Sequence, residues 1–284
     1  MKDLETRDSL SSAITIGFIA GSTEAIITNP LVTIKSCLQR GVPLPWSSGI
    51  ANMTTFMYRG IGARMTGIGL SVGIRIMVHD AMVHYIFESP KLSLQQEAIT
   101  AVGTGFCSAF FNTPFELGMT LQQTDPNKRA DNFLKTLRNV QTKWGVKKSF
   151  SGFSCIFGRD VIVTSGFLNF TPKFKEYVAN EYNYDSHASS LLGGTAIGTA
   201  LSVLTHPLDT IKTIQQTNLR DSKLYGASSI INSAQQVFDK NGIRGFYKGL
   251  FFRAARIGPH VGIVTSMSEA LTDHSNNYLR NNKM

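Results

Sequence analysis

Residues 207–216 read Pro-Leu-Asp-Thr-Ile-Lys-Thr-Ile-Gln-Gln, and the 284-residue chain contains two stretches with the same outline, at 30–39 and 114–123. Their prolines are spaced by 84 and 93 residues, and a glutamine stands nine positions after each proline. Further along each unit, an aromatic residue precedes a glycine by two positions, and these glycines are Gly60, Gly152 and Gly249. Such self-similarity indicates a repeated structural unit. The sequence therefore predicts three repeats, 1–92, 93–184 and 185–284, within one integrated domain.

Six long stretches with few charges and many small residues flank these motifs. One leads into each proline and another follows each glycine, and together they cover residues 10–39, 61–87, 94–123, 153–179, 187–216 and 250–278. Each exceeds the ~20 residues that a helix needs to cross a membrane. A soluble helical bundle is the alternative, but glycine pairs such as Gly17 and Gly21 are unfavourable inside soluble helices and allow close helix contact in lipid. We therefore expect an all-α membrane protein with six transmembrane helices in three pseudo-threefold repeats.

The composition fits transmembrane spans that keep one polar face. Charged residues make up 17% and hydrophobic residues 42%, which disfavours disorder and a highly charged soluble surface. A mean hydropathy of −0.02 is too low for helices that are apolar all round. The three cysteines are far apart and form no Cys-x-x-Cys pair, so neither a disulfide framework nor a zinc site is predicted. The first twelve residues resemble neither a signal peptide nor a transit peptide, so any targeting information is expected within the chain.

The net charge of +9 is unevenly distributed between the connecting segments. Segments 40–60, 123–152 and 216–249 carry +2, +5 and +3, whereas segments 1–10, 84–97 and 176–187 carry −1, −1 and −3. Basic loops gather on one membrane face, so this distribution predicts three basic loops on one side and both termini on the other. Nucleic-acid binding is not expected, because the basic residues are spread over three similar loops without a recognition motif.

The three proline motifs place polar side chains on one helix face. The second, fifth and ninth residues after each proline are three and four positions apart, so they share a face just beyond a proline that bends the helix. Three such faces would meet around a pseudo-threefold axis. Acids at the second position and bases at the fifth could then pair between neighbouring helices and close one end of a central cavity.

These residues resemble the mitochondrial carrier family over essentially the whole chain. The threefold Pro-x-acid-x-x-base motif, the following glutamine and the aromatic-base-Gly element carry the resemblance, and the third repeat, residues 207–216 and 242–259, matches best. The resemblance implies a six-helix bundle with three short helices on the matrix side. It also implies alternating access around one central site and metabolite exchange across the mitochondrial inner membrane. The expected protein is a multi-pass monomer with both termini toward the intermembrane space.

The family pattern assigns a matrix gate to the proline motifs. It implies ion pairs between Glu116 and Lys212 and between Asp209 and Lys35, with the motif prolines Pro30, Pro114 and Pro207 as helix kinks. The third pair would be Val32 with Met119, where both charges are absent. An acid or a base at only one of these two positions would be an unpaired buried charge, which is costly. We therefore expect two salt bridges and one hydrophobic contact. The resemblance also implies three braces beneath the gate, Gln39, Gln123 and Gln216.

The family pattern also implies a cytoplasmic gate near the other ends of the even-numbered spans. Counting 20 residues from each repeat glycine gives Asp80, Pro172 and Glu269, and the partner positions are Val83, Lys175 and Thr272. In the family pairing the complete pair is Asp80 with Lys175. Glu269 belongs either to this gate or to the solvated surface.

Ionisable residues predict a substrate site near the middle of the membrane. Arg159 and Arg256 stand seven residues after their repeat glycines, and the same cavity-facing positions are expected for Arg75 and His260. Arginines in a membrane interior suit a carboxylate or phosphate. Asp160 follows Arg159, which resembles the family's amino-acid carriers, although it could instead pair with a neighbouring helix. Arg75 equally suits a structural pair with Asp80 or with a backbone carbonyl, and His260 suits a polar residue at a kink.

The repeat glycines also predict lipid contacts. Free N–H groups at a helix start favour phosphate, and the family resemblance implies that cardiolipin binds at Arg59, Gly60, Gly152, Lys248 and Gly249. Apart from structural cardiolipin, no cofactor and no metal are expected.

The sequence favours a transporter over an enzyme, because it contains no dinucleotide, P-loop or metalloprotease motif. The expected substrate is a small anionic or zwitterionic metabolite, with an amino-acid-like compound favoured and nucleotides or carboxylates as alternatives. A non-transporting scaffold and a proton leak also remain open.

Overall fold

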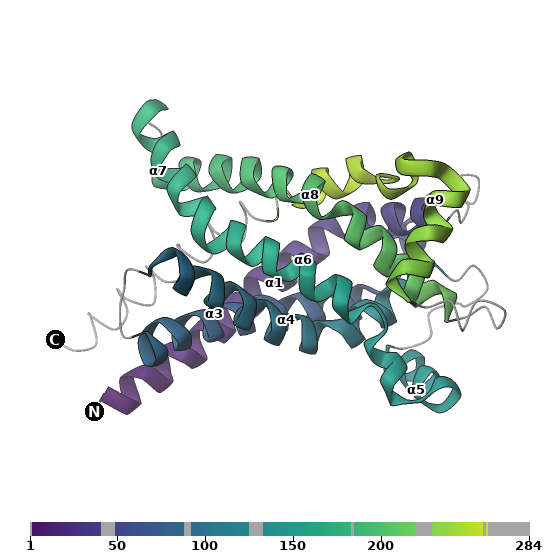
Figure 1. Cartoon of the computed structure of the whole chain (residues 1–284), viewed down its shortest axis with the longest axis horizontal. Coiled ribbons are helices and arrows are strands. Elements are labelled where there is room, and N and C mark those ends of the chain that lie inside the picture. The colour runs from purple at the N-terminus through teal and green to yellow at the C-terminus, as the bar shows by residue number, and fades with distance from the viewer. Residues whose placement is uncertain are drawn as a thin grey trace.

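The computed structural model describes residues 2–40, 49–87, 92–124, 133–182, 185–219, 229–257 and 260. Within these ranges the chain is helical and contains no strand, so the predicted all-α class is confirmed there. Figure 1 shows long helices that run along the molecule, with α5 and α9 at the end opposite the N-terminus.

Three long helices contain the motif prolines. They are α1 (Lys2–Arg40), α4 (Leu94–Gln123) and α8 (Ser186–Asn218), and each has its proline inside the helix. Ser93 and Asp185 begin α4 and α8, because their side chains accept hydrogen bonds from the backbone N–H groups of Gln96 and Ala188. An internal proline removes one backbone hydrogen bond and bends the helix. Because the three prolines occupy equivalent positions in the repeats, the bends are expected at equivalent positions of α1, α4 and α8.

The even-numbered spans begin at the repeat glycines. Gly60 and Gly152 precede α3 (Ile61–Ala81) and α6 (Phe153–Ser165), and residues 250–257 form the start of the last span, which we call the 250–257 helix. α3 continues into the π-helical turn η1 (Met82–Ile86). α6 continues through a second π-helical turn, η3 (Gly166–Phe170), into α7 (Thr171–Tyr182). A π turn adds a residue to the helical register. Because η1 and η3 begin at different distances from their repeat glycines, positions counted 20 residues from those glycines are not equivalent.

Short helices connect the long ones on one side of the bundle. They are α2 (Ile50–Met57), α5 (Phe133–Trp144) with the 3-10 turn η2 (Val146–Phe150), and α9 (Ile230–Phe246). α2 is joined to α1 by its last carbonyl, since Met57 O accepts hydrogen bonds from Asn29 at 2.7 Å and Thr33 at 2.9 Å. The three connecting helices lie where the repeat pattern predicts them.

The long helices pack in a ring. α1 contacts α3, α3 contacts α4, α4 contacts α6, α6 and α7 contact α8, and α8 contacts α1. Each repeat glycine lies against the residue five positions after the motif proline of the next repeat. Gly60 lies against Met119, Gly152 against Lys212, and Gly249 against Lys35. This cyclic order shows that the three repeats close on one another around a common centre.

The surface and the interior are reversed relative to a water-soluble protein. Small and polar side chains such as Thr33, Ser108 and Gln123 are buried, whereas Ile27, Phe111 and Leu204 are exposed. Within the described part of the chain, two helical segments are long and apolar enough to cross a membrane, Ile50–Ile86 and Ala188–Asn218. The polar interior explains the middling mean hydropathy, because the apolar residues face outward toward lipid.

Replacing Gly152 with alanine should destabilise the bundle. Gly152 has φ 85°, and an added Cβ would lie 2.9 Å from Lys212 Cγ. Gly60 has the same left-handed conformation, with φ 75° and ψ 9°, but the nearest atom to an added Cβ there is the flexible end of Gln122 at 3.3 Å, so Gly60→Ala is a matched control. We expect both variants to lose about 1–2 kcal/mol through backbone strain, and Gly152→Ala to melt at the lower temperature in detergent. Equal melting temperatures would contradict the close packing of Gly152 on Lys212.

Candidate functional site

A cavity that is partly open to solvent lies between the long helices, near the motif prolines. Its lining comes from all three repeats, including Val32 of α1, Gly67 of α3 and Phe115 of α4. Its charged lining consists of Lys35, Arg64, Glu116, Arg159, Asp209, Lys212 and Arg256. Half of the residues that line the cavity therefore carry a charge.

The acid and base positions of the proline motifs meet at one end of this cavity. Lys35 of α1 forms an ion pair with Asp209 of α8. Lys212 of α8 forms another with Glu116 of α4, with 2.8 Å between Nζ and Oε2. Val32 and Met119, at the third pair of positions, are buried in one apolar cluster with Ala63 and the flanking Phe133. Two ionic contacts and one apolar cluster therefore tie the three repeats together.

The three glutamines that follow the motifs also make contacts between repeats. Gln39 of α1 donates to Thr210 Oγ1 at 3.1 Å and accepts from Thr213 Oγ1 at 2.9 Å. Gln123 of α4 accepts from Ser36 Oγ of α1 at 3.0 Å. Gln216 of α8 donates to the Ser151 carbonyl at 3.2 Å, just before α6. The three glutamines stand four residues, about one helical turn, beyond Lys35, Met119 and Lys212 on the same helices.

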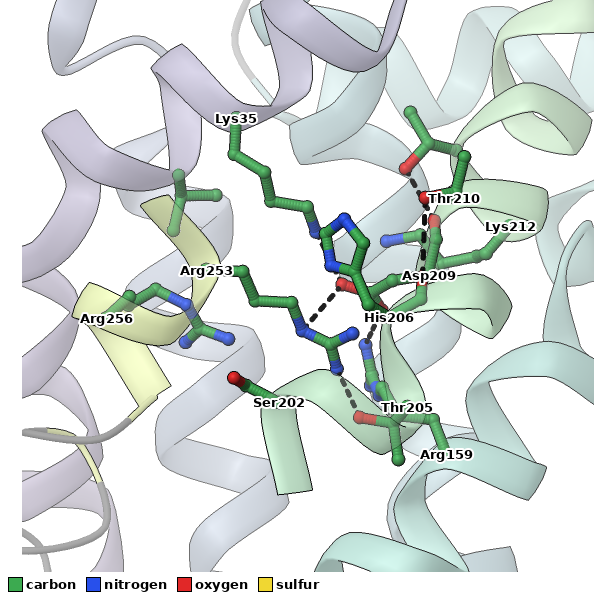
Figure 2. A network of polar contacts seen from close by, with 12 residues as sticks. Lys35, Arg159, Ser202, Thr205, His206, Asp209, Thr210, Lys212, Arg253 and Arg256 are labelled. Carbon is green, nitrogen blue, oxygen red and sulfur yellow. Dashed lines mark hydrogen bonds and ion pairs between the residues drawn. The ribbon is translucent and has the colours of Figure 1, made fainter. Parts of the chain in front are cut away.

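Asp209 is the centre of a larger ionic network than the motif predicts (Figure 2). Lys35 of α1, Arg159 of α6 and Arg253 of the 250–257 helix all point toward its carboxylate, with Arg159 at 3.1 Å and Arg253 at 3.4 Å. Arg253 is 1% exposed and also donates to Thr205 Oγ1 at 2.7 Å. Asp209 therefore joins three different helices to α8.

Arg159 contacts three carboxylates that come from three helices. Its guanidinium lies 2.8 Å from Glu116 of α4, 2.8 Å from Asp160 of its own helix and 3.1 Å from Asp209 of α8. Arg159 lines the cavity as the sequence predicts. Its planar set of donors suits this multiple contact. The arginine that is predicted to meet substrate is thus already bound to both acids of the proline motifs.

Asp160 is paired with a neighbouring helix. Arg75 of α3 lies 2.9 Å from its Oδ2, and Ser108 of α4 donates to the same oxygen at 3.1 Å. Arg75 also donates to Ser108 Oγ at 3.0 Å. With 1% of its surface exposed, Asp160 lies behind the cavity wall. Asp160 therefore pairs with a neighbouring helix, which is one of the two alternatives that the sequence allows for it. Its partner is Arg75.

A second ionic cluster surrounds Glu24 on the other side of the cavity. Glu24 of α1 is fully buried and lies 3.0 Å from Arg64 of α3, 3.5 Å from Arg256 and 3.4 Å from His260 Nδ1. Arg64 also donates to the Ala25 carbonyl at 2.8 Å. Two arginines and a histidine thus face one carboxylate.

The predicted gate on the opposite side is only partly described. Asp80 lies 3.4 Å from His79 Nδ1, and the backbone of Lys175 lies 3.2 Å from the Cβ position of Gly193 on α8. Glu269 lies outside the described residues. The pairing of Asp80 with Lys175 stays a prediction. Among the predicted lipid contacts, the Arg59 guanidinium covers the Phe56 ring at 4.8 Å, and the Lys248 carbonyl contacts His206.

Sequence reasoning missed three charged residues of the site: Glu24, Arg64 and Arg253. Arg64 and Arg253 each stand four residues after a repeat glycine, and each donates to a threonine two residues before a motif proline. The register of the repeats could have revealed both. Glu24 is the sole acidic residue between residues 10 and 39, and an acid within a predicted span is itself a signal for a functional site.

The site has an excess of positive charge. Among the described residues, five cationic side chains line the cavity, but only two carboxylates, Glu116 and Asp209, do so. Including the contacting side chains adds two cations, Arg75 and Arg253, and two carboxylates, Glu24 and Asp160. The excess of three positive charges stays the same. Such an excess is costly in an interior of low polarity, so the cavity favours an anion.

The chain is similar to known carrier proteins. The family described as mitochondrial carrier protein matches residues 90–182 and 183–279. The mitochondrial citrate transporter A of Aspergillus niger is 29% identical, over 95% of this chain and 94% of the relative. The mitochondrial dicarboxylate carrier of Caenorhabditis elegans is 27% identical, over 90% and 91%. The succinate/fumarate mitochondrial transporter of Saccharomyces cerevisiae is 27% identical, over 92% and 90%.

A charge pair introduced at Val32 and Met119 tests whether these two residues face each other. Val32→Asp or Met119→Lys alone places an unpaired charge in the apolar cluster, and we expect each to cost about 3–5 kcal/mol of stability. The double variant should recover about 0.5–3 kcal/mol relative to the sum of the two single losses. Melting temperatures of the four proteins in detergent measure this coupling.

The matched control combines Val32→Asp with Ile243→Lys, because Ile243 is 70% exposed on α9 and far in sequence from the cluster. These two changes should be additive. A Val32/Met119 pair that is equally additive would contradict the contact.

Proposed function

Because the chain belongs to the mitochondrial carrier family, we propose that it carries a small anion with two or more carboxylates across the mitochondrial inner membrane. Members of this family are transporters, so the chain is a multi-pass membrane transporter of metabolites and not an enzyme. The substrate class, the alternating mechanism and the exchange mode are the parts that we propose.

The observation that carries the substrate class is the charge excess of the cavity. Arg159 and Arg256 line it from α6 and the 250–257 helix, and Lys35 and Lys212 lie at the end with the ion pairs. An arginine binds a carboxylate through two parallel hydrogen bonds. A dicarboxylate could contact Arg159 with one group and Arg256 with the other, and it would offset most of the excess charge.

The names of several relatives support a carboxylate. They include a citrate transporter, a dicarboxylate carrier and a succinate/fumarate transporter, although an ornithine transporter is 24% identical as well. An amino-acid-like substrate would need a carboxylate of the protein to bind its ammonium group. Asp160, the residue that suggested this class, is buried against Arg75 and Arg159. We therefore favour a carboxylate anion over an amino acid.

Transport would proceed by alternating access. The ion pairs of Lys35 with Asp209 and of Lys212 with Glu116 hold the three repeats together at the proline bends, and we propose that they form the closed matrix gate. An incoming carboxylate competes with Glu116 and Asp209 for Arg159. This competition removes the bridge that Arg159 makes between Glu116 of α4 and Asp209 of α8, so substrate binding shifts the population toward opening. Since the empty carrier keeps its gate paired, exchange is the expected mode.

The orientation, the lipid contacts and the monomeric state belong to the same proposal. The basic connecting segments would face the matrix, with both termini toward the intermembrane space. Backbone N–H groups after Gly60, Gly152 and Gly249 would hold cardiolipin phosphates, and one chain would contain a complete site. A scaffold without transport activity would have no use for the buried arginines of the cavity, which favours a working carrier.

Uptake into liposomes that contain the purified protein tests this function. The panel is radiolabelled succinate, citrate, 2-oxoglutarate, aspartate, ornithine and ATP, each with and without the same compound inside. We expect uptake of at least one di- or tricarboxylate, faster with internal counter-substrate. Arg256→Ala and Arg159→Ala should each reduce it about 10- to 100-fold, because each removes a charge-assisted contact.

Arg244→Ala is the matched control, because Arg244 is an exposed arginine on α9. It should transport like the unmodified protein. Uptake of ornithine but of no carboxylate would contradict the substrate class, and failure to take up any compound on the panel would contradict the transport function.

A further inference from the structure

The buried carboxylate of Glu24 has one oxygen that its surroundings leave unsatisfied. Oε1 accepts hydrogen bonds from Thr28 Oγ1 and from Arg64, the latter at 3.0 Å, and lies 3.5 Å from Arg256. Oε2 has no hydrogen-bond partner among the described residues, although it is fully buried. A fully buried carboxylate oxygen without a hydrogen-bond donor, which we call the orphaned oxygen, is unfavourable. We therefore expect a ligand or a proton to bind next to it.

His260 faces this oxygen. Its Nδ1 lies 3.4 Å from Glu24 Oε2, and this nitrogen also lacks a hydrogen-bond partner among the described residues. The His260 side chain is 16% exposed, so it is partly accessible while the Glu24 side chain is not. A proton on Nδ1 would make this nitrogen a hydrogen-bond donor, and the orphaned oxygen would accept the bond.

Resting on the proposed function, we propose that Glu24 and His260 form a proton site, and that a proton is carried together with the carboxylate anion. On loading, an N–H bond forms at His260 Nδ1 with a proton from the aqueous side, and the imidazolium donates to Glu24 Oε2. On release, the same N–H bond breaks and the proton leaves to the other side. No oxidant, reductant or further group is needed.

The charges around this site explain why the proton and the anion would bind together. Glu24 of α1 faces Arg64 of α3, and Arg256 and His260 from the last span, so a proton on His260 leaves three cations around one carboxylate. That arrangement is unfavourable in the empty cavity. A substrate carboxylate on Arg256 supplies the missing negative charge. By linkage the proton then favours the anion as much as the anion favours the proton.

The other charged groups of the cavity are already paired and are poor proton carriers. Glu116 is bound to Lys212 and Arg159, and Asp209 to Lys35, Arg159 and Arg253. Protonating Glu116 would deprive Lys212 of its carboxylate partner, and protonating Asp209 would deprive Lys35 and Arg253 of theirs. Asp160 is bound to two arginines and lies behind the cavity wall. Among these charged groups, the Glu24–His260 pair next to Arg64 and Arg256 of the cavity lining therefore accepts a proton at the lowest cost.

Succinate uptake under a pH difference tests the proposal. Liposomes that contain the protein but no internal counter-substrate are held at zero membrane potential, so that no proton leaves with a counter-substrate. Net accumulation of succinate is compared between equal pH and an outside one unit more acidic. A co-transported proton can raise accumulation up to about tenfold under one pH unit. We expect the ratio of succinate uptake with an acidic outside to uptake at equal pH to be several-fold for the unmodified protein and near one for His260→Asn. In the unmodified protein, a pH-sensitive dye inside the vesicles should report protons that enter with succinate.

Controls separate the protein's proton from the weak-acid chemistry of succinate. That chemistry is the same for every variant, so only the difference between variants counts. His84→Asn is the matched control, because His84 is an exposed histidine in η1, and it should keep the full ratio. Glu24→Gln keeps an acceptor for Arg64 but removes the charge, and its ratio should fall as for His260→Asn.

Each outcome decides the proposal. A ratio of one in the unmodified protein, or an unchanged ratio in His260→Asn, would overturn it while leaving carboxylate transport intact. If His260→Asn transports too slowly, proton uptake on adding succinate to the detergent-purified protein in weak buffer decides instead. For each succinate bound, the unmodified protein should take up about one proton more than His260→Asn. Equal proton uptake by the two proteins would overturn the proposal. Absence of any succinate or citrate uptake would instead count against the proposed function.

Discussion

The arrangement of the cavity depends on the contacts of the partly buried guanidinium of Arg159. It bridges Glu116 of α4 and Asp209 of α8, the same two acids that pair with Lys212 and Lys35 across the repeats. Removing one partner from a buried ion pair leaves an uncompensated charge, which is costly. Anything that binds Arg159 therefore changes the contacts of both acids at once. This shared set of partners connects a site that suits an anion to the contacts that hold the helices together.

The three repeats are similar in geometry but unequal in charge. The first and third carry an arginine four residues after the repeat glycine, and the second has Ile156 there. The second repeat instead contributes Arg159, one helical turn further on. The proline motifs differ as well, since Val32 and Met119 form an apolar contact where the other pairs are ionic. A symmetric scaffold thus carries an asymmetric site, so a bound anion would have a defined orientation.

The sequence predicts the scaffold well because the repeats fix it. The span predicted over 94–123 corresponds to α4 (Leu94–Gln123), and Gly60 and Gly152 stand where α3 and α6 begin. Periodicity, however, cannot reveal π turns, which depend on tertiary packing. η3 therefore shifts the register of the fourth span, and counting from Gly152 becomes unreliable beyond Gly166.

The contacts of the site are harder to predict than its members. Arg159 and Arg256 are identified by position, but the sequence cannot show that Arg159 reaches three carboxylates or that Asp160 turns to Arg75. Adjacent helical residues point ~100° apart, and the choice between cavity and neighbour depends on the ring of helices. Glu24 carries no motif, and its importance emerges only when Arg64, Arg256 and His260 surround it.

The central claim is that the cavity holds an excess of positive charge that a carboxylate anion offsets. Calorimetric titration of the purified, detergent-solubilised protein tests it most directly, with succinate, its neutral diamide succinamide, and the dication of 1,4-diaminobutane as three four-carbon probes. The account predicts binding of about one succinate per chain, weakened by rising salt, and no binding of the other two. Equal binding of succinamide, or binding of the dication without succinate, would contradict it.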